Sequence, residues 1–198
     1  MKKTILLICL LFASGSLHSQ TQPGTWELSV SGNLGSVSIS SETRGSYTSS
    51  YSESHSFFSL ALRPGYYIVN DLALEPEVFW TAIEGDLPSF SLSGNLSYNF
   101  RIPDSQVKPF VLIGYGIGNA IPVFQRVFYR ASDKFDIPVL HLGAGLKVFL
   151  TKRIALRTEY RYQRYSYEQT YHYDSYNYTI KTKENFHNVF FGFSVFLP

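Results

Sequence analysis

The sequence predicts an all-β fold, an eight-stranded antiparallel up-and-down transmembrane β-barrel. Three observations support this: apolar and polar residues alternate at every second position along most of the chain, eight segments show that alternation, and the first 19 residues have the form of a secretory signal. Aromatic residues reach 17% while charged residues make up only 16%, below the roughly 25% of a typical soluble domain. One face of each strand therefore needs an apolar environment.

Residues 1–19 are predicted to be a signal peptide that is removed. Lys2 and Lys3 precede the apolar run TILLICLLF, and a small, polar stretch allows cleavage after Ser19 or a few residues earlier. The run is shorter than the about 20 residues of a membrane-spanning helix. Removal takes away both lysines and Cys9, which leaves residues 20–198 with equal numbers of acidic and basic residues and no cysteine. We therefore expect no nucleic-acid partner, no disulfide and no cysteine metal site.

The clearest strand is FSLSGNLSYNFRI, residues 90–102. Leu92 and Leu96 fall on one face of this segment, and Ser93 and Asn95 fall on the other. The same alternation recurs in seven further segments, residues 26–34, 58–68, 72–81, 111–118, 140–150, 154–163 and 188–197. A tilted strand crosses a bilayer with about 9 to 11 residues, so most of these segments are long enough.

The connections between the predicted strands alternate in length. Longer connections are expected at residues 41–52, 83–89, 120–134 and 168–184, and short ones at 70–71, 103–107 and 151–153. Short turns at one end and long loops at the other are typical of outer-membrane barrels. Together with the signal peptide, this predicts a bacterial outer-membrane location, with the long loops extracellular and both termini periplasmic.

The polar face of the strands carries charged residues at strand centres. In a small barrel this face points inward, where an unpaired ion in a low dielectric is costly, so we expect a network of ion pairs. The predicted members are Arg63, Glu75, Glu77, Arg101, Lys147, Arg157, Glu159 and Arg161. Glycines on the same face, expected to relieve crowding in the narrow interior, are Gly114, Gly116, Gly118, Gly143, Gly145 and Gly192.

Eight tyrosines lie in the 24 residues 157–180. Tyr160 and Tyr162 continue the apolar face to where the strand leaves the hydrocarbon, the position of an aromatic girdle. The apolar face then shifts before Tyr165, which predicts a β-bulge at the rim. Beyond it we expect a hairpin above the membrane with its turn near Asp174-Ser175. Further girdle candidates are Trp26, Tyr66, Trp80, Phe90, Phe100 and Phe110.

No motif in the chain predicts a catalytic, cofactor or metal site. GYGIG at residues 114–118 lacks the helix that a nucleotide-binding loop requires. Glu75 and Glu77 share one strand face without a cleft, and His141 is interpreted as an interior group. The histidines lack metal-ligand spacing. His172, Asp174 and Ser175 are close in sequence, but in a predicted loop where their geometry cannot be assigned.

Several motifs resemble the small outer-membrane β-barrel family of OmpA-like and OmpX-like proteins. They are the signal peptide, GYGIG (114–118), LHLGAGLKVF (140–149), LRTEYRY (156–162) and VFFGFSVFL (189–197). The resemblance covers the whole mature chain. It implies that the last strand is an insertion signal for the outer-membrane assembly machinery, although Leu197-Pro198 replaces the usual final aromatic residue. The outward residues of that strand are Val189, Phe191, Phe193, Val195 and Leu197.

These observations favour a non-enzymatic structural and interaction scaffold that displays extracellular loops. The alternatives are a narrow pore for small solutes and a lipid A-modifying enzyme. Expected partners are outer-membrane lipid including lipopolysaccharide, the assembly machinery during insertion, and an extracellular protein or glycan at residues 41–52 and 168–184. The rival fold is a soluble, lipocalin-like barrel, in which large apolar residues would fill the interior and the charged strand centres would face water.

Overall fold

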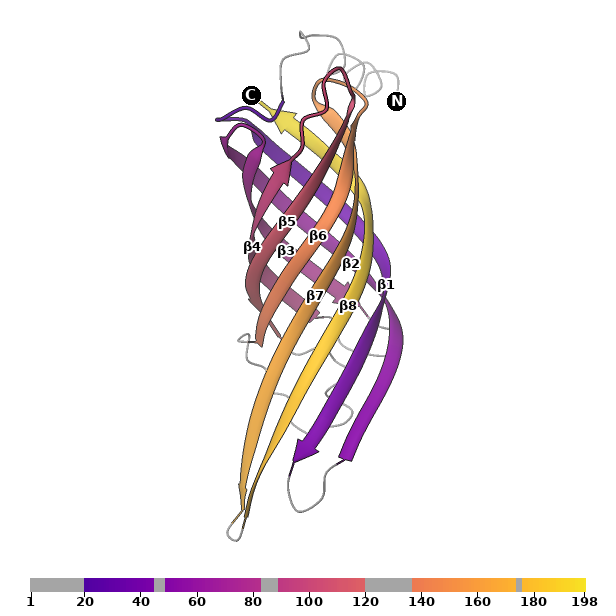
Figure 1. Ribbon diagram of the computed structural model, residues 1–198, viewed down its shortest axis with the longest axis vertical. Coiled ribbons are helices and arrows are strands. Elements are labelled where there is room, and N and C mark those ends of the chain that lie inside the picture. Colours follow the sequence, from indigo (N-terminus) through magenta and orange to yellow (C-terminus); the bar gives the residue numbers. More distant parts are fainter. Residues whose placement is uncertain (1–19, 45–48, 83–88, 120–136, 174–175) are drawn as a thin grey trace, which may run out of the picture.

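A closed barrel of eight antiparallel strands, each hydrogen-bonded to its neighbours in sequence, forms the body of the molecule (Figure 1). The computed structural model describes residues 20–44, 49–82, 89–119, 137–173 and 176–198. The strands are β1 (Trp26–Arg44), β2 (Ser49–Val69), β3 (Leu72–Ala82), β4 (Ser89–Asn99), β5 (Val107–Gly118), β6 (Ile137–Phe149), β7 (Ile154–Tyr173) and β8 (Tyr176–Leu197). β1 pairs with β8 and closes the barrel, which confirms the predicted fold class. No helix among the described residues is long and apolar enough to span a membrane.

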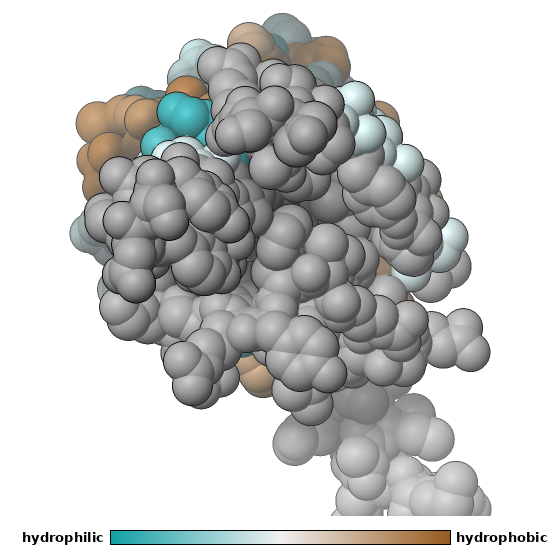
Figure 2. Space-filling model, turned by 90° about the horizontal axis from the view of Figure 1, so that it is seen from below, coloured by the Kyte–Doolittle hydropathy of each residue, from teal (hydrophilic) through white to brown (hydrophobic). Residues whose placement is uncertain are grey.

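The alternation of side chains follows the predicted phase. On β4, Leu92 and Leu96 are 50% and 40% exposed on the outside, whereas Asn95 and Ser97 are buried inside. Because the side-chain period of a strand is two, a slip by one residue would exchange the two faces. The rival soluble barrel would need the opposite phase and is wrong. Seen from the end of the long hairpins, apolar side chains are visible at the left and upper margins of the molecule (Figure 2).

Short turns close one end of the barrel. The β2–β3 turn contains Asp71, whose φ of 64° lies in the left-handed region that aspartate tolerates better than most residues. Residues 20–25 fold against this end: Thr21 accepts a hydrogen bond from the Asp71 amide at 2.8 Å, and Gly24 donates one to the Tyr67 carbonyl at 2.9 Å. Thr21 is fully buried there. The segment that follows the predicted signal therefore covers the mouth on the short-turn side.

The strands differ twofold in length. β3, β4, β5 and β6 have 11 to 13 residues, whereas β1, β2, β7 and β8 have 19 to 22. The four long strands are neighbours in the order β7-β8-β1-β2 and extend beyond the short strands as two long hairpins (Figure 1). Residues 41–52 and 168–184, expected to be loops, are therefore mostly strand. The other expected long connections, 83–89 and 120–134, fall almost entirely outside the described residues.

The predicted bulge between Tyr162 and Tyr165 is wrong. The pairing of β7 with both β6 and β8 runs through these residues without a shift of register, and the only irregularity among the described pairs lies between Tyr67 and Val69. Tyr165 points inward and is 6% exposed, in the same alternation as the residues before it. The apolar residues change face in the sequence because the outward environment changes, not because the backbone does.

Candidate functional site

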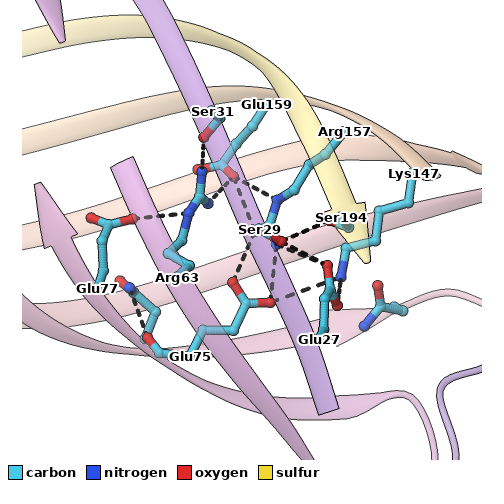
Figure 3. Close-up of polar contacts among 12 residues, drawn as sticks. Glu27, Ser29, Ser31, Arg63, Glu75, Glu77, Lys147, Arg157, Glu159 and Ser194 are labelled. Atoms are coloured by element: carbon cyan, nitrogen blue, oxygen red, sulfur yellow. Dashed lines mark hydrogen bonds and ion pairs between the residues drawn. The ribbon is translucent and has the colours of Figure 1, made fainter. Parts of the chain in front are cut away.

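Among the described residues, the interior of the barrel holds a concentrated group of charged side chains. Eight charged residues project inward from five strands: Glu27 from β1, Arg63 from β2, Glu75 and Glu77 from β3, Lys147 from β6, and Arg157, Glu159 and Arg161 from β7. All of them except Arg161 are labelled in Figure 3. We call these eight residues the lumen network. Strand alternation places them all on the inner face, and each is at most 2% exposed.

The part of the network nearer the short turns is centred on Arg157. Its guanidinium binds Glu75 through two hydrogen bonds of 2.9 and 3.2 Å and also donates to Glu159 and Glu27. Glu27 in turn accepts a hydrogen bond from the Lys147 ammonium at 2.7 Å and one from the Tyr67 hydroxyl at 2.7 Å. Charge-assisted and bidentate contacts of this kind are the strongest hydrogen bonds available to side chains.

The part nearer the long hairpins is centred on Arg63 and Arg161. Arg63 lies 2.6 Å from Glu159 and 3.1 Å from Glu77, and its remaining amino group donates to Ser31. Arg161 donates to both oxygens of Glu77 at 2.7 Å and to Glu159 at 2.6 Å. Glu159 therefore joins three arginines and connects the two halves of the network.

The lumen network contains as many cations as carboxylates. Glu27, Glu75, Glu77 and Glu159 face Arg63, Lys147, Arg157 and Arg161, so the group is neutral when fully ionised. Removing one member of a buried pair leaves an uncompensated ion at a cost of about 3 to 5 kcal/mol. Each buried charge is therefore stabilised only while its partners in the network are present.

Aromatic rings pack against the charged groups. Phe110 lies 4.4 Å from the Arg157 guanidinium carbon, and Phe190 lies 4.9 Å from that of Arg161. A β-carbon added at Gly145 would come within 2.8 Å of the Phe110 ring, so this glycine makes room for it. Phe110 is only 1% exposed, and its assignment to the girdle is wrong. The ring is inside because it covers a buried cation.

Further side chains fill the lumen on both sides of the network. Tyr67, Phe149 and Phe196 pack together with Ala73 and Ala155 toward the short turns. Toward the long hairpins, a polar layer comprises His141, Gln163, Asn188 and Asn33. Further toward the long hairpins, the ring centroid of Phe186 lies 5.0 Å from that of Phe57 and 5.4 Å from that of Tyr165. The described lumen is therefore occupied by side chains along its length.

Two residues depart from the predicted network. Arg101 lies beyond the end of β4, where it contacts Asp71 at 2.9 Å with its own side chain 55% exposed, so it belongs to the rim and not to the lumen. Its position follows from the strand ending at Asn99. Glu27, by contrast, is a full member that the sequence prediction omitted. Its alternation with Trp26 and Leu28 already placed it inside. Without Arg101, the predicted set had four cations and three carboxylates, so charge balance called for one more carboxylate.

The outward face carries aromatic residues at two levels. Trp26 and Tyr66 contact each other at 4.9 Å near the short turns, where Phe100 also lies outward. Near the long hairpins, Trp80 pairs with Phe90 across β3 and β4, and Tyr160 and Tyr162 lie outward on β7. The residues of the predicted insertion strand are all exposed on the outside of β8. These positions fit two membrane interfaces with an apolar belt between them.

Of the other residues considered for chemistry, those that the structure describes are not gathered into a reaction centre. His141 is buried beside Glu77, 3.9 Å away, and Arg161. Glu75 and Glu77 both bind arginines in the network. Asp174 and Ser175 lie outside the described residues, as does the side chain of His172. In the described part of the chain, no group of histidine, cysteine and acidic residues could hold a metal ion.

Comparison with known proteins identifies the family. The model of the outer membrane protein beta-barrel domain matches residues 5–195, almost the whole chain. The chain belongs to this family. As a member of the outer membrane protein beta-barrel domain family, it is a β-barrel protein of the bacterial outer membrane. No curated protein matches the sequence.

Solved structures share the fold of this outer-membrane barrel. Neisserial surface protein A (NspA) superposes with a TM-score of 0.53 at 16% identity, covering 87% of this chain and 96% of that one. The outer membrane protein OprG from Pseudomonas aeruginosa also gives a TM-score of 0.53, at 13% identity, with 89% and 98% covered. At such identities the likeness concerns the fold alone.

Proposed function

We propose that the protein is a closed, non-enzymatic scaffold that carries two strand-built hairpins out of the outer membrane for contact with other molecules. The observation that carries this proposal is the contrast between a lumen filled by paired charges and four strands that continue past the lipid-facing belt. On β7, about ten residues beyond Tyr162 correspond to roughly 30 Å of strand. A simple pore does not by itself require such an extension.

The filled lumen supports a non-conducting barrel over the narrow pore. Arg63, Arg157 and Arg161 are at most 1% exposed and have carboxylate partners, whereas the wall of an aqueous channel exposes its charges to water. In planar bilayers we expect no steady ion conductance from the purified protein. Discrete channel openings that persist when the preparation is purified further would favour the pore instead.

The extended hairpins are proposed to face the outside of the cell, with the short turns in the periplasm. The signal peptide expected at residues 1–19 supports this orientation, as does the location of the described N- and C-terminal segments at the short-turn end (Figure 1). The candidate contact surfaces are residues 41–52 and 168–184, for an extracellular protein or glycan. The expected insertion signal on β8 would serve the assembly machinery once, during biogenesis.

Cysteine labelling of intact cells tests the orientation. The sequence contains only Cys9, within the expected signal peptide, so a single introduced cysteine reports on its own position. We expect a membrane-impermeant maleimide to label Ser52→Cys on β2 and not Lys152→Cys in the β6–β7 turn. The reverse pattern would overturn the proposed display.

A lipid A mass spectrum that is identical with and without the protein is the expected result for a scaffold, and a changed acyl pattern would favour the enzyme.

A further inference from the structure

The segment before β1, residues 20–25, is held against the short-turn end of the barrel by specific contacts (Figure 1). The Thr21 carbonyl accepts a hydrogen bond from the Asp71 amide at 2.8 Å, and the Thr21 hydroxyl donates to the Asp71 carboxylate. The same hydroxyl accepts a hydrogen bond from the Lys108 ammonium at 2.8 Å. Thr21 is fully buried by these contacts, so the chain is anchored in the fold from this residue onward.

Gln20 is the residue that cleavage after Ser19 makes the first of the mature chain. It directly precedes the anchored Thr21 and is itself half-buried. Its side-chain amide donates to the Thr151 carbonyl in the β6–β7 turn at 3.3 Å. After cleavage at this position, the mature chain would therefore begin within the folded end of the barrel and not in a free tail.

The charges at the short-turn end favour an uncharged chain terminus. Asp71, which binds the neighbouring Thr21, is already paired with Arg101 at 2.9 Å and with Lys108 at 3.8 Å. A free α-amine is mostly protonated at neutral pH, and a half-buried cation without a partner of its own is costly. The described charged side chains at this end are the cations Arg101, Lys108, Lys152 and Arg153 and the acids Asp71 and Asp104.

An N-terminal glutamine can lose its charge by reacting with its own side chain. The unprotonated α-amine attacks the side-chain amide carbon Cδ, and the new N–Cδ bond closes a γ-lactam. The Cδ–Nε2 bond breaks, and Nε2 leaves as ammonia with one proton from the amine. An α-amine titrates at about pH 8, so a fraction of it is available as a nucleophile at neutral pH. The reaction needs no oxidant, reductant or cofactor.

We propose that Gln20 is a modification site, and that signal cleavage after Ser19 is followed by its cyclisation to pyroglutamate. Because Thr151 binds Nε2 in the folded chain, the ring closes before this segment docks. The lactam carries no charge, and its ring N–H remains as a donor for the Thr151 carbonyl. The contacts of Thr21 do not involve the modified groups and are retained.

The modification has a consequence for the mouth on the short-turn side, which residues 20–25 cover. A lactam leaves no α-amine for an aminopeptidase to attack, so the segment keeps its full length. The inference goes beyond the proposed function, because it does not depend on what the long hairpins contact.

Mass spectrometry of the mature protein tests the modification. Primary amines in freshly harvested outer membranes are first blocked by reductive dimethylation, so that later handling cannot close the ring. The N-terminal peptide that trypsin releases by cleavage after Arg44 is then analysed. We expect it to begin at Gln20, to be lighter than the unmodified peptide by one ammonia, about 17 Da, and to carry no dimethyl group on its α-nitrogen.

Two variants separate the reacting side chain from its neighbourhood. Gln20→Ala removes the side-chain amide and should give a fully dimethylated α-amine. Gln22→Ala, which replaces an exposed glutamine of the same segment, is the matched control and should keep the lactam. Folding of both variants is checked by heat-modifiable gel mobility.

Two results for the unmutated protein would overturn the proposal: a dimethylated Gln20, or a mature chain that begins elsewhere, for example at Leu17. Labelling of Ser52→Cys on intact cells does not depend on the chain terminus. Failure of that labelling with an intact lactam therefore refutes the proposed display alone, and a dimethylated Gln20 with intact labelling refutes the modification alone.

Discussion

The two halves of β7 and β8 use the same backbone register in opposite ways. Within the lipid-facing belt, Tyr160 and Phe191 point outward while Arg161 and Glu159 are buried inside. Beyond it, Lys181 and Glu168 point outward and Phe186 and Tyr165 are buried inside. The strands cross from one arrangement to the other without a bulge.

The difference shows that the phase of the apolar pattern reports the solvent outside the sheet. Lipid accepts apolar side chains and leaves the polar ones for the lumen, whereas water does the reverse. The rung of Tyr162 and His187 marks the change and so locates one boundary of the membrane on the molecule. The comparison can be tested by making the same kind of substitution in both regions.

Loss of a carboxylate should have its largest effect inside the belt. Glu159→Gln leaves Arg63, Arg157 and Arg161 without the acid that joins them. We expect the free energy of unfolding in lipid vesicles, measured by urea titration, to fall by about 3 to 5 kcal/mol. Glu168→Gln removes an exposed partner of Lys181 and should cost less than about 0.5 kcal/mol. Similar losses for the two variants would contradict the distinction between the regions.

An arginine introduced on the outward face should affect stability differently in the two regions, because one region faces lipid and the other faces water. Leu96→Arg places a charge in the middle of the lipid-facing belt and is expected to lower the free energy of unfolding by about 2 to 4 kcal/mol. Ser52→Arg makes the same addition on the outward face of the extension of β2, in water, and should change it by less than about 0.5 kcal/mol. A costly Ser52→Arg would place that residue in lipid and refute the boundary.

Alanine substitutions at two glycines test how tightly the lumen is packed. An added methyl at Gly145 would overlap the Thr158 carbonyl oxygen and the Phe110 ring, whereas none of the described atoms lies within 4 Å of one at Gly94. Gly145→Ala should therefore destabilise the barrel by about 1 to 3 kcal/mol in the same urea titration. Gly94→Ala should be neutral or slightly stabilising. If both variants behaved alike, the interior would have more room than its side chains indicate.

Apart from the control variants, the smallest effect is expected at the boundary itself. Tyr160→Phe removes the hydroxyl that contacts His187 at 2.8 Å and leaves the ring in place. Because this contact is exposed, we expect a loss of about 0.5 to 1 kcal/mol in the free energy of unfolding. Phe191→Leu, on the same face but further from the long hairpins, tests separately how much apolar contacts contribute to the free energy of unfolding. A loss above about 2 kcal/mol for Tyr160→Phe would show that the hydroxyl is shielded from water.

Much of the barrel could be predicted because lipid imposes one rule on every strand. The inward placement of Arg63, Glu75 and Lys147 followed from alternation alone, as did the outward placement of Leu92 and Phe193. The contacts within the lumen network were harder to predict, because knowing that a residue faces inward does not show which residues it contacts. Arg101 has the same strand phase as Asn99 but lies past the end of β4. The sequence suggested an interfacial ring for Phe110, but this ring packs over the Arg157 guanidinium inside the barrel.

The sequence by itself determined the fold class, the phase of each strand within the lipid-facing belt and the sign of each lumen charge, because these depend on local alternation and on the environment of each face. Only the tertiary structure decided that Arg157 meets Glu75 and Glu27, that Glu159 joins three arginines, and that the described parts of residues 41–52 and 168–184 are strand. Those features depend on closure of β1 onto β8 and on the shared register of four long strands. Closure and register bring together residues more than 100 positions apart, such as Glu27 and Arg157, so no local pattern records them.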